Sequence, residues 1–507
     1  MTAAMEKYYL TFDAGTQSVK VAVFDAAMQC VVSSVHPTTL LYPEPGWAEM
    51  DLDEYLRCTV AGMKDCAVQL AEKGIAVSSV AAIMGDGVIC GIGGIAADGQ
   101  VITPYINYLD SRTKDDAVAL ASRNLSIWRE ETGNPEPLCM FPAMHARWLL
   151  AHSKEFQQHG AKFVHDAPYV LMKLAGLQAK DAFIDWGTLS GWGLGYDVIK
   201  KIWSKEQLQL LGLREEYMPR IVKPWEIVGH LTEKMARETG FAAGTPICAG
   251  AGDTMQSMLG CGILEAGRAV DVAGTCAMFC VSTDRIIPEL SQPGSGLIFN
   301  SGTLENTYFY WGFVRTGGLA LRWFKDNVCG QTENNAYYQE LSARAAFVPE
   351  GSNGVLFLPY LTGGYGASEV RGCFLNMTMD TDQSVLWRSV LEAIAFDYRD
   401  IVNTYRGAGI AIDSIHVTEG GSRDALWNQI KADVLESRIK TYANAGGALL
   451  MNALVGSYAI GGCRDLKKVL QKQLIPAACF TPRPEAAHVY HEQAAEQKRL
   501  LQRLDSK

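Results

Sequence analysis

The chain has 507 residues, which exceeds the size of a single hydrophobic core and predicts two large domains. Hydrophobic residues make up 48% and charged residues 20% of the sequence, the composition of a compact soluble protein. The net charge of -10 excludes long-range attraction to nucleic acid or to an anionic membrane, so a phosphate site must be built locally.

The cysteines and the N-terminal residues predict a cytoplasmic protein. The 13 cysteines show no Cys-x-x-Cys pair or zinc-type spacing, which is typical of small buried residues in a reducing compartment. Residues 1–7 lead straight into a strand and leave no room for a signal peptide. Apolar runs elsewhere are too short to span a membrane.

Residues 8–25 predict a β-hairpin whose turn can bind phosphate. Val19, Val21 and Val23 alternate with other residues directly after the turn 13–16, so the turn opens a strand and not the helix of a Rossmann unit or P-loop. Backbone amides and hydroxyl groups of such a turn can face an anion, and Asp13 can hold Mg²⁺. The alternative interpretation is an ordinary surface hairpin.

Strands and helices then alternate through the first half, which predicts an α/β layer. An amphipathic helix begins near Asp51, and a buried strand at 79–84 ends in the turn Gly85-Asp86-Gly87. Further elements are expected at 30–34 and 101–108 as strands, and at 143–152 and 169–177 as helices.

A second hairpin at 267–281 repeats the Gly-Thr turn about half the chain later, again with an Asp just before it. Two such hairpins imply two related lobes that grip one polyphosphate, and we expect the change of lobe near 244–246. In the second half we expect a helix at 386–405, a strand at 414–418, and a helix capped by Ser422. This arrangement resembles the actin, Hsp70 and sugar kinase group, and the resemblance implies an α/β, two-lobed actin/Hsp70/sugar kinase (ribonuclease H-like) fold with an interlobe ATP cleft.

The sequence resembles the FGGY carbohydrate kinases across nearly its whole length, and the order and spacing of short motifs carry the resemblance. The resemblance implies an N-terminal lobe at 1–247, with the first phosphate hairpin and the sugar pocket, and a C-terminal lobe at 248–507, with the second hairpin and the adenosine site. The matching segments are Asp13-Ala14-Gly15-Thr16, Gly250-Ala251-Gly252-Asp253, Ala273-Gly274-Thr275, Phe357-Leu358-Pro359-Tyr360, Arg371-Gly372, Gly420-Gly421, Leu426-Trp427 and Ala432-Asp433.

Asp253 is the candidate catalytic base, because this is where the family keeps that carboxylate. A sugar hydroxyl is a poor nucleophile and needs a carboxylate that orients it and accepts its proton as the γ-phosphoryl group moves. The alternative interpretation is that Asp253 only caps the helix that begins there.

The resemblance implies ATP and Mg²⁺ as cofactors. It assigns the metal to Asp13 and Asp253 and the nucleotide to two sets of residues. The alternative interpretation of the Gly-Gly pairs in the second set is a simple turn, which is the commoner use of Gly-Gly. The phosphates would contact Gly15, Thr16, Gln17, Ser18, Gly274 and Thr275, and the base and ribose would contact Gly317, Gly318, Gly420, Gly421 and Asn428.

The acceptor pocket departs from the family pattern. Residues 87–91 stand where xylulokinases carry Gly-Gln-Met-His-Gly, so Val88 and Cys90 replace two polar sugar contacts and disfavour substrates whose hydroxyls need them. Asp86 could supply a carboxylate, but a Gly-Asp-Gly turn is the favoured interpretation. The substrate residues implied are Val88, Ile89, Cys90, Tyr108, Asp110, Asp253 and Thr254.

These residues predict ATP-dependent phosphorylation of a sugar or related polyol, with a ketose such as xylulose as acceptor, by in-line transfer with Asp253 as base. The alternatives are an autoinducer-2-type kinase, a glycerol or polyol kinase, or a nucleotide-binding sensor without kinase turnover. The expected partner is a small sugar or polyol, with no nucleic acid and no membrane, and a homodimer is compatible with this prediction.

Overall fold

The computed structural model describes residues 6–274, 277–314, 317–361, 370–443 and 447–505. The chain forms two compact units, and each is discontinuous in sequence. Unit 1 comprises Met1–Leu264, Asp284–Tyr308 and Gly446–Gln473, and unit 2 comprises Glu265–Thr283, Phe309–Ala445 and Leu474–Lys507. Residues 248–264, which the sequence assigned to the second lobe, therefore lie in unit 1.

Unit 1 is built on a mixed sheet whose centre is formed by β1 (Tyr8–Ala14) and β5 (Val80–Gly87). The predicted first hairpin is confirmed, since β1 pairs antiparallel with β2 (Ser18–Phe24). The strand order is β13-β14-β5-β1-β2-β3, and β15 also pairs with β5. The bounds of the other strands are Cys30–Pro37 for β3, Ile227–His230 for β13, Pro246–Cys248 for β14 and Ala251–Gly252 for β15.

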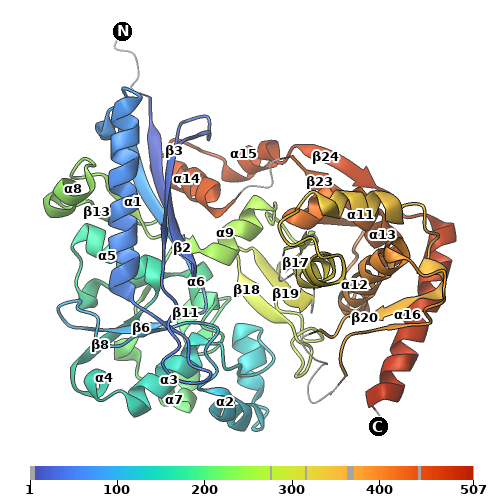
Figure 1. Cartoon of the computed structure of the whole chain (residues 1–507). Coiled ribbons are helices and arrows are strands. Elements are labelled where there is room, and N and C mark those ends of the chain that lie inside the picture. Colours follow the sequence, from blue (N-terminus) through green and yellow to red (C-terminus); the bar gives the residue numbers. More distant parts are fainter. Residues whose placement is uncertain (1–5, 275–276, 315–316, 362–369, 444–446, 506–507) are drawn as a thin grey trace. The chain divides into compact units, whose positions relative to one another are not determined.

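The two faces of this sheet are covered by different helices. One face packs on α1 (Leu52–Glu72) and α5 (Asp166–Ala175), through a core that includes the predicted inward-facing valines of β2. The other face packs on α14 (Ala448–Ala459) and α9 (Asp253–Gly260). Figure 1 shows α1, in blue, running along β2 and β3.

The start of α1 follows the prediction, because Asp51 is its N-cap and accepts a hydrogen bond from the amide of Asp53 at 2.8 Å. The predicted turn at 85–87 is wrong, because β5 runs through these residues. The strand expected at 101–108 is limited to Tyr105–Ile106. Both differences are related to buried residues. Asp86 is buried within the sheet, whereas the apolar residues at 101–108 are packed without forming a long strand pairing.

The remaining helices and strands of unit 1 lie outside this sheet. They are β4 (Glu49–Met50), β6 (Gly93–Ala96), β7 (Tyr105–Ile106), α2 (Lys114–Ala121), α3 (Pro142–His152), α4 (Lys154–His159), β8 (Gly160–Val164), β9 (Phe183–Asp185), α6 (Trp186–Ser190), β10 (Tyr196–Asp197), β11 (Ile202–Trp203), α7 (Lys205–Leu211), β12 (Arg220–Val222), α8 (Glu233–Thr239), β18 (Ile298–Ser301) and α15 (Leu466–Gln473).

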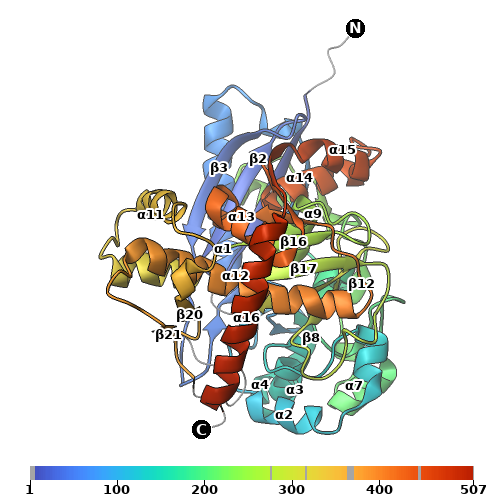
Figure 2. The ribbon, with the colours of Figure 1, turned by 90° about the vertical axis from the view of Figure 1, so that its right-hand side faces the viewer.

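Unit 2 also contains a mixed sheet, in which β16 (Ala269–Val272) pairs antiparallel with β17 (Ala277–Thr283), as the second predicted hairpin requires. The strands of this sheet that belong to unit 2 follow the order β19-β17-β16-β22-β23-β24. Figure 2 shows the C-terminal helix α16, in red, beside α13. The other bounds are Tyr308–Val314 for β19, Ser414–Thr418 for β22, Arg438–Tyr442 for β23, Pro476–Phe480 for β24, Leu356–Leu358 for β20, Cys373–Leu375 for β21, Gly317–Trp323 for α10, Tyr337–Ala345 for α11, Gln383–Gly407 for α12, Ala425–Leu435 for α13 and Pro484–Asp505 for α16.

A buried ion pair joins the second hairpin to α13 within unit 2. Lys431 donates to Asp271 over 2.7 Å, and Tyr398 donates to the same carboxylate over 2.6 Å. Both charged side chains are at most 1% exposed, so removing either partner would leave an uncompensated buried charge. In the parts of the chain that the structure describes, no helix has the length and apolar character needed to cross a bilayer.

Candidate active site

Three aspartates meet at the end of the unit 1 sheet. Asp13 on β1 and Asp86 on β5 are paired neighbours in a parallel ladder, so their side chains emerge on the same face. Strand β15 pairs with β5 beside Asp86, and Asp253 follows β15 directly as the first residue of α9. The ladder therefore brings the predicted metal ligand and the predicted base to one edge of one sheet.

The charges of these carboxylates influence one another. Burial is the main cause that raises the pKa of Asp253 to about 7, the charge of Asp13 adds to it, and hydrogen bonds from Thr254 oppose it. Asp253 keeps part of its surface exposed. Burial also raises the pKa of Asp86, which is 0% exposed. Lys20 compensates part of this charge, since its ammonium group lies 3.0 Å from Asp13.

The residue before Asp253, Gly252, leaves no room for a side chain. A Cβ atom on Gly252 would lie 2.1 Å from Cγ2 of Ile89, far inside van der Waals contact. Gly252, and not Asp253, is the N-cap residue of α9. The carboxylate of Asp253 accepts instead from the amide and hydroxyl of Thr254, the residue that follows it.

The turn of the first hairpin is closed by its own backbone and held by the next segment. The amide of Gly15 donates to the carbonyl of Ser18 over 3.1 Å, and Thr38 donates through its amide to the carbonyl of Gln17. Thr16 accepts from Asn107 at 3.4 Å, and Gln17 is exposed. The four predicted phosphate residues are thus gathered in one turn adjacent to Asp13.

The predicted acceptor residues 88–90 form a buried loop directly after β5. Their side chains are 5–6% exposed. Asp166, at the start of α5, accepts from the amide of Val88 over 3.1 Å, and Tyr105 donates to the carbonyl of Val88 over 3.3 Å. Cys90 donates to Gly191 at 3.4 Å, so its thiol is already engaged. The loop reaches Asp253 through Ile89, which packs on Gly252.

Tyr108 and Asp110 have different environments. Tyr108 is 38% exposed. Asp110 is 1% exposed, and its carboxylate accepts from Arg112 at 2.7 Å and from the amide of Ala48 at 2.7 Å. Arg112 also stacks on Trp47 with 3.7 Å between its guanidinium carbon and the ring centroid. The carboxylate of Asp110 thus anchors a buried arginine.

In unit 2, three glycine segments predicted from separate motifs lie together. The amide of Gly318 donates to Gly274 and the amide of Gly421 donates to Ala273, both over 3.0 Å. Asn428 supports the last segment by donating to the carbonyls of Gly421 and Ser422. Gly317 packs against Ala277, while Thr275 lies outside the described residues.

These glycines form one wall of a cavity of about 730 Å³. Tyr338 and Trp387 bring aromatic surface to it, and Leu321 brings aliphatic surface. At one side Trp387 donates to Ser342 over 3.0 Å, and Ser342 donates to Asp424 over 2.5 Å. A pocket with apolar walls and exposed glycine backbone suits a flat heterocycle joined to phosphate groups. The residues that line it are Ala273, Gly274, Gly318, Leu321, Arg322, Asn335, Tyr338, Gln339, Ser342, Ala343, Ala346, Trp387, Glu419, Gly420, Gly421, Arg423, Asp424, Ala425, Leu426 and Trp427.

Asp424 corrects the predicted helix start. It is the N-cap of α13 and accepts from the amide of Trp427 at 3.0 Å, whereas Ser422 donates to Glu419. Sequence reasoning also missed Ser342 and Trp387 as pocket residues. Asp424 precedes the apolar helix run by one residue, and this N-cap signal could have been read from the sequence. Ser342 and Trp387 come from distant helices and carry no local signal.

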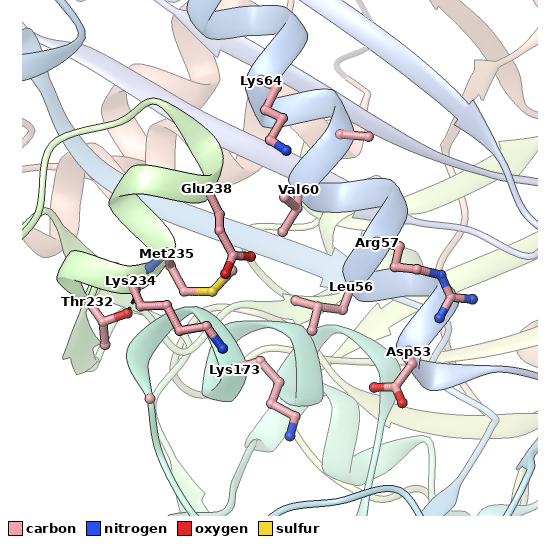
Figure 3. A pocket seen from close by; sticks show the side chains of 12 residues that line it. Asp53, Leu56, Arg57, Val60, Lys64, Lys173, Thr232, Lys234, Met235 and Glu238 are labelled. Carbon is pink, nitrogen blue, oxygen red and sulfur yellow. Dashed lines mark hydrogen bonds between the residues drawn. The ribbon is translucent and has the colours of Figure 1, made fainter.

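A second hollow, of about 660 Å³, lies on unit 1 between α1, α5 and α8 (Figure 3). Lys64, Lys173 and Lys234 surround it, over an apolar floor that includes Leu56 and Met235. Lys173 donates to the carbonyl of Gly99 at 2.7 Å, so one of these cations is engaged. None of the predicted site residues lines this hollow.

Comparison with known proteins supports both halves of this description. The N-terminal domain model of the FGGY family of carbohydrate kinases matches residues 8–260, and its C-terminal domain model matches residues 269–460. Xylulose kinase of Bacillus subtilis is 22% identical over 487 residues, covering 96% of this chain and 94% of that protein. Gluconokinase of the same organism is 26% identical over 473 residues, covering 90% and 88%.

The crystal structure of xylulose kinase from Rhodospirillum rubrum superposes with a TM-score of 0.87 at 24% identity, covering 98% of this chain and 99% of that one. The two mixed α/β sheets thus form the two-domain fold of these kinases. With family models matched across both halves, the chain belongs to the FGGY family of carbohydrate kinases, which are ATP-dependent enzymes.

Proposed function

We propose that this kinase transfers the γ-phosphoryl group of ATP to a hydroxyl of a ketose or a related small polyol, with Asp253 as the general base. The observation that carries the proposal is the placement of Asp253. Its carboxylate lies at the start of α9, where burial, with the charge of Asp13 as the second cause, raises its pKa to about 7. A carboxylate with this pKa is ionised in about half of the molecules at neutral pH and accepts a proton readily.

In the proposed reaction the carboxylate of Asp253 accepts a hydrogen bond from the acceptor hydroxyl and then takes its proton. The oxygen of that hydroxyl forms the new bond to the γ-phosphorus, while the bond from the γ-phosphorus to the bridging oxygen breaks and leaves ADP. The first-turn amides of α9 carry partial positive charge and favour the anionic form of Asp253. Ile89 packs on Gly252, beside the reacting carboxylate.

The glycine cluster of unit 2 is the proposed nucleotide site. Apolar and aromatic side chains suit adenine, and Gly274, Gly318 and Gly421 carry no side chain that would keep phosphate or ribose away from this wall. We assign further phosphate contacts to Thr275 and to the turn 15–18. Gly317 and Asn428 support the glycine segments from behind, since Gly317 packs on Ala277 and Asn428 binds two carbonyls.

Mg²⁺ is the proposed metal, with Asp13 and Asp253 as its protein ligands. Within the described ranges no three His, Cys, Asp or Glu side chains surround one ion position. Mg²⁺ is usually held by one or two carboxylates with phosphate and water oxygens, so the pair fits this ion. Asp86 is the ladder neighbour of Asp13 and lies beside this pair of carboxylates. When bound, Mg²⁺ neutralises charge on the transferred group.

The acceptor is proposed to be a ketose of the xylulose type. Xylulose kinases and gluconokinases are among the relatives, which supports a sugar or a sugar acid as the acceptor. Val88 and Cys90 offer fewer hydrogen bonds than the polar residues of xylulokinases, which favours an acceptor with fewer recognised hydroxyls. Polyols, glycerol and autoinducer-type diketones are therefore included among the acceptors to be tested.

The test is ADP release measured with a coupled assay over pentuloses, hexuloses, gluconate, polyols, glycerol and autoinducer-type diketones. We expect sugar-dependent ADP release that is strongest with one ketose, and none when ATP or the acceptor is omitted. If the protein binds ADP but none of these acceptors stimulates ADP release from ATP, the result would contradict the proposed kinase activity and favour a nucleotide sensor.

A further inference from the structure

Helix α14 carries one carboxamide in an otherwise apolar buried stretch. Asn452 is 0% exposed and lies between Met451 and Ala453, which are also buried. A carboxamide in such surroundings is costly unless its hydrogen bonds are made. Asn452 lies outside the sequence motifs described above, so its hydrogen bonds need their own explanation.

The hydrogen bonds of Asn452 join the two elements that carry the proposed active carboxylates. Its Nδ2 group donates to the carbonyl of Phe12 over 3.2 Å, and Phe12 directly precedes Asp13. The same nitrogen donates to Oδ2 of Asp86 over 2.9 Å. Its Oδ1 atom accepts from Gln256 over 2.6 Å. Gln256 lies three residues after Asp253 on α9, about one helical turn along.

The connection continues beyond α9. Oε1 of Gln256 accepts from the hydroxyl of Thr303 over 3.0 Å, and Gln256 is itself 0% exposed. The orientation of both carboxamides is therefore fixed: the nitrogen of Asn452 must face an acceptor carbonyl and a carboxylate, and its oxygen must face a donor. An aspartate at this position would oppose a carbonyl and Asp86 with negative charge, and an aliphatic residue would leave buried polar groups unpaired.

We propose that Asn452 and Gln256 form a positioning pair that sets the separation between Asp13 and Asp253. The inference rests on the proposed kinase function and assigns to these two residues no contact with substrate. Transfer depends on the relative position of the base and the metal-binding carboxylate, and a displacement of about 1 Å can cost roughly 10²-fold in rate. Since Asn452 holds the backbone before Asp13 and Gln256 belongs to the helix of Asp253, their hydrogen bond fixes that position.

The test is a double-mutant cycle with Asn452→Ala and Gln256→Ala, in which kcat, both KM values, the ADP dissociation constant and the melting temperature are measured. We expect each single variant to lower kcat by about 10- to 100-fold. Both KM values and the ADP dissociation constant should stay within about threefold, because neither residue contacts a ligand. The double variant should lose about as much kcat as the less active of the two single variants, because the proposed positioning effect depends on the hydrogen bond that joins Asn452 and Gln256.

Asn134→Ala is the matched control. Asn134 is also 0% exposed in unit 1 and its carboxamide bonds Gly193 and Phe299, at 2.8 and 2.9 Å. We expect this variant to lower the melting temperature while kcat stays within about twofold. If Asn452→Ala does not fold, Thr303→Val provides the mildest change, because it removes only the bond to Gln256.

Three results would overturn the inference. The first is an unchanged kcat in folded Asn452→Ala and Gln256→Ala variants. The second is a multiplicative loss in the double variant, which would show two independent effects. The third is an equal loss of kcat in Asn134→Ala, which would show a general effect of lost stability. A wild-type protein that turns over no acceptor would instead overturn the proposed function, and this inference with it.

Discussion

The protonation of Asp253 is set by neighbours that the fold supplies. Burial disfavours its charge and Asp13 adds repulsion, whereas Thr254 stabilises the anion. The folded-state pKa of about 7 lies above the ordinary value of 3.8. A group whose pKa is raised on folding binds its proton more tightly in the folded state, so its contribution to stability falls as pH rises between these values. Catalysis requires the opposite form, the ionised carboxylate.

We therefore expect kcat/KM for the acceptor to fall as pH is lowered through about 7, by roughly tenfold for each further pH unit. The ionised fraction of Asp253 decreases with this slope, while binding in the unit 2 pocket does not depend on it. The measurement is a pH profile from pH 5 to 9, with added ADP as a control of the coupling enzymes at each pH. A flat profile between pH 5 and 7 would contradict the role of Asp253.

Single residues differ in how well sequence could predict them. Asp13 and Asp253 can be selected as candidate site residues from short motifs, because each carboxylate stands close to a glycine in the sequence. Asp86 lies between two glycines, a pattern that predicts a turn, yet β5 continues through it. The glycines are needed for packing: a Cβ on Gly85 would meet the ring of Phe12, and one on Gly87 would meet Asp166. Such tertiary contacts cannot be read from the sequence alone.

At the scale of elements, the start of α13 joins helix capping to the nucleotide pocket. Asp424 caps the helix through Oδ1 and receives the hydroxyl of Ser342 at Oδ2, and Ser342 in turn holds Trp387. The same carboxylate thus fixes the start of a helix and one side of the cavity.

Asp424→Ala should lower the free energy of unfolding by about 1 kcal/mol through loss of the cap. It should also weaken ADP binding by roughly threefold to tenfold, because lost hydrogen bonds of this type contribute about 0.5–1.5 kcal/mol each. Denaturant unfolding and ADP titration calorimetry measure the two effects. Asp51→Ala is the control, since Asp51 caps α1 in unit 1. Equal ADP dissociation constants for both variants would contradict the coupling.

Elements with strong local patterns could be predicted from the sequence. Both Gly-Thr hairpins, helix α1 and strand β22 have the expected type and nearly the expected bounds, because alternation and helical spacing decide them. The segment 101–108 has an apolar strand pattern but forms only the two-residue β7. Its apolar side chains are buried by packing against α1 and β4, so the sequence pattern alone overestimates the length of the strand.

At the scale of the whole molecule, each unit carries part of the proposed chemistry. Unit 1 holds the carboxylates and unit 2 holds the glycine-lined pocket. The sequence predicts a single boundary near 247, whereas residues 248–264 belong to unit 1 and the chain returns to that unit at residues 446–473. The segment 446–473 contains α14 and therefore Asn452. In the sequence, Asn452 is recognisable as a polar residue within an apolar helical stretch.

This division of tasks predicts that acceptor phosphorylation and nucleotide binding can be separated by one substitution. Asp253→Asn keeps the size of the side chain and its place on α9 but cannot accept the proton. The pocket of unit 2 is untouched by the change.

The most direct test is acceptor-dependent ADP release by Asp253→Asn at saturating MgATP, with the ADP dissociation constant determined on the same sample. We predict a loss of kcat of about 10²- to 10⁴-fold, with ADP affinity within about threefold of the wild-type value. Near-full turnover by the folded variant would contradict the assignment of Asp253 as the base.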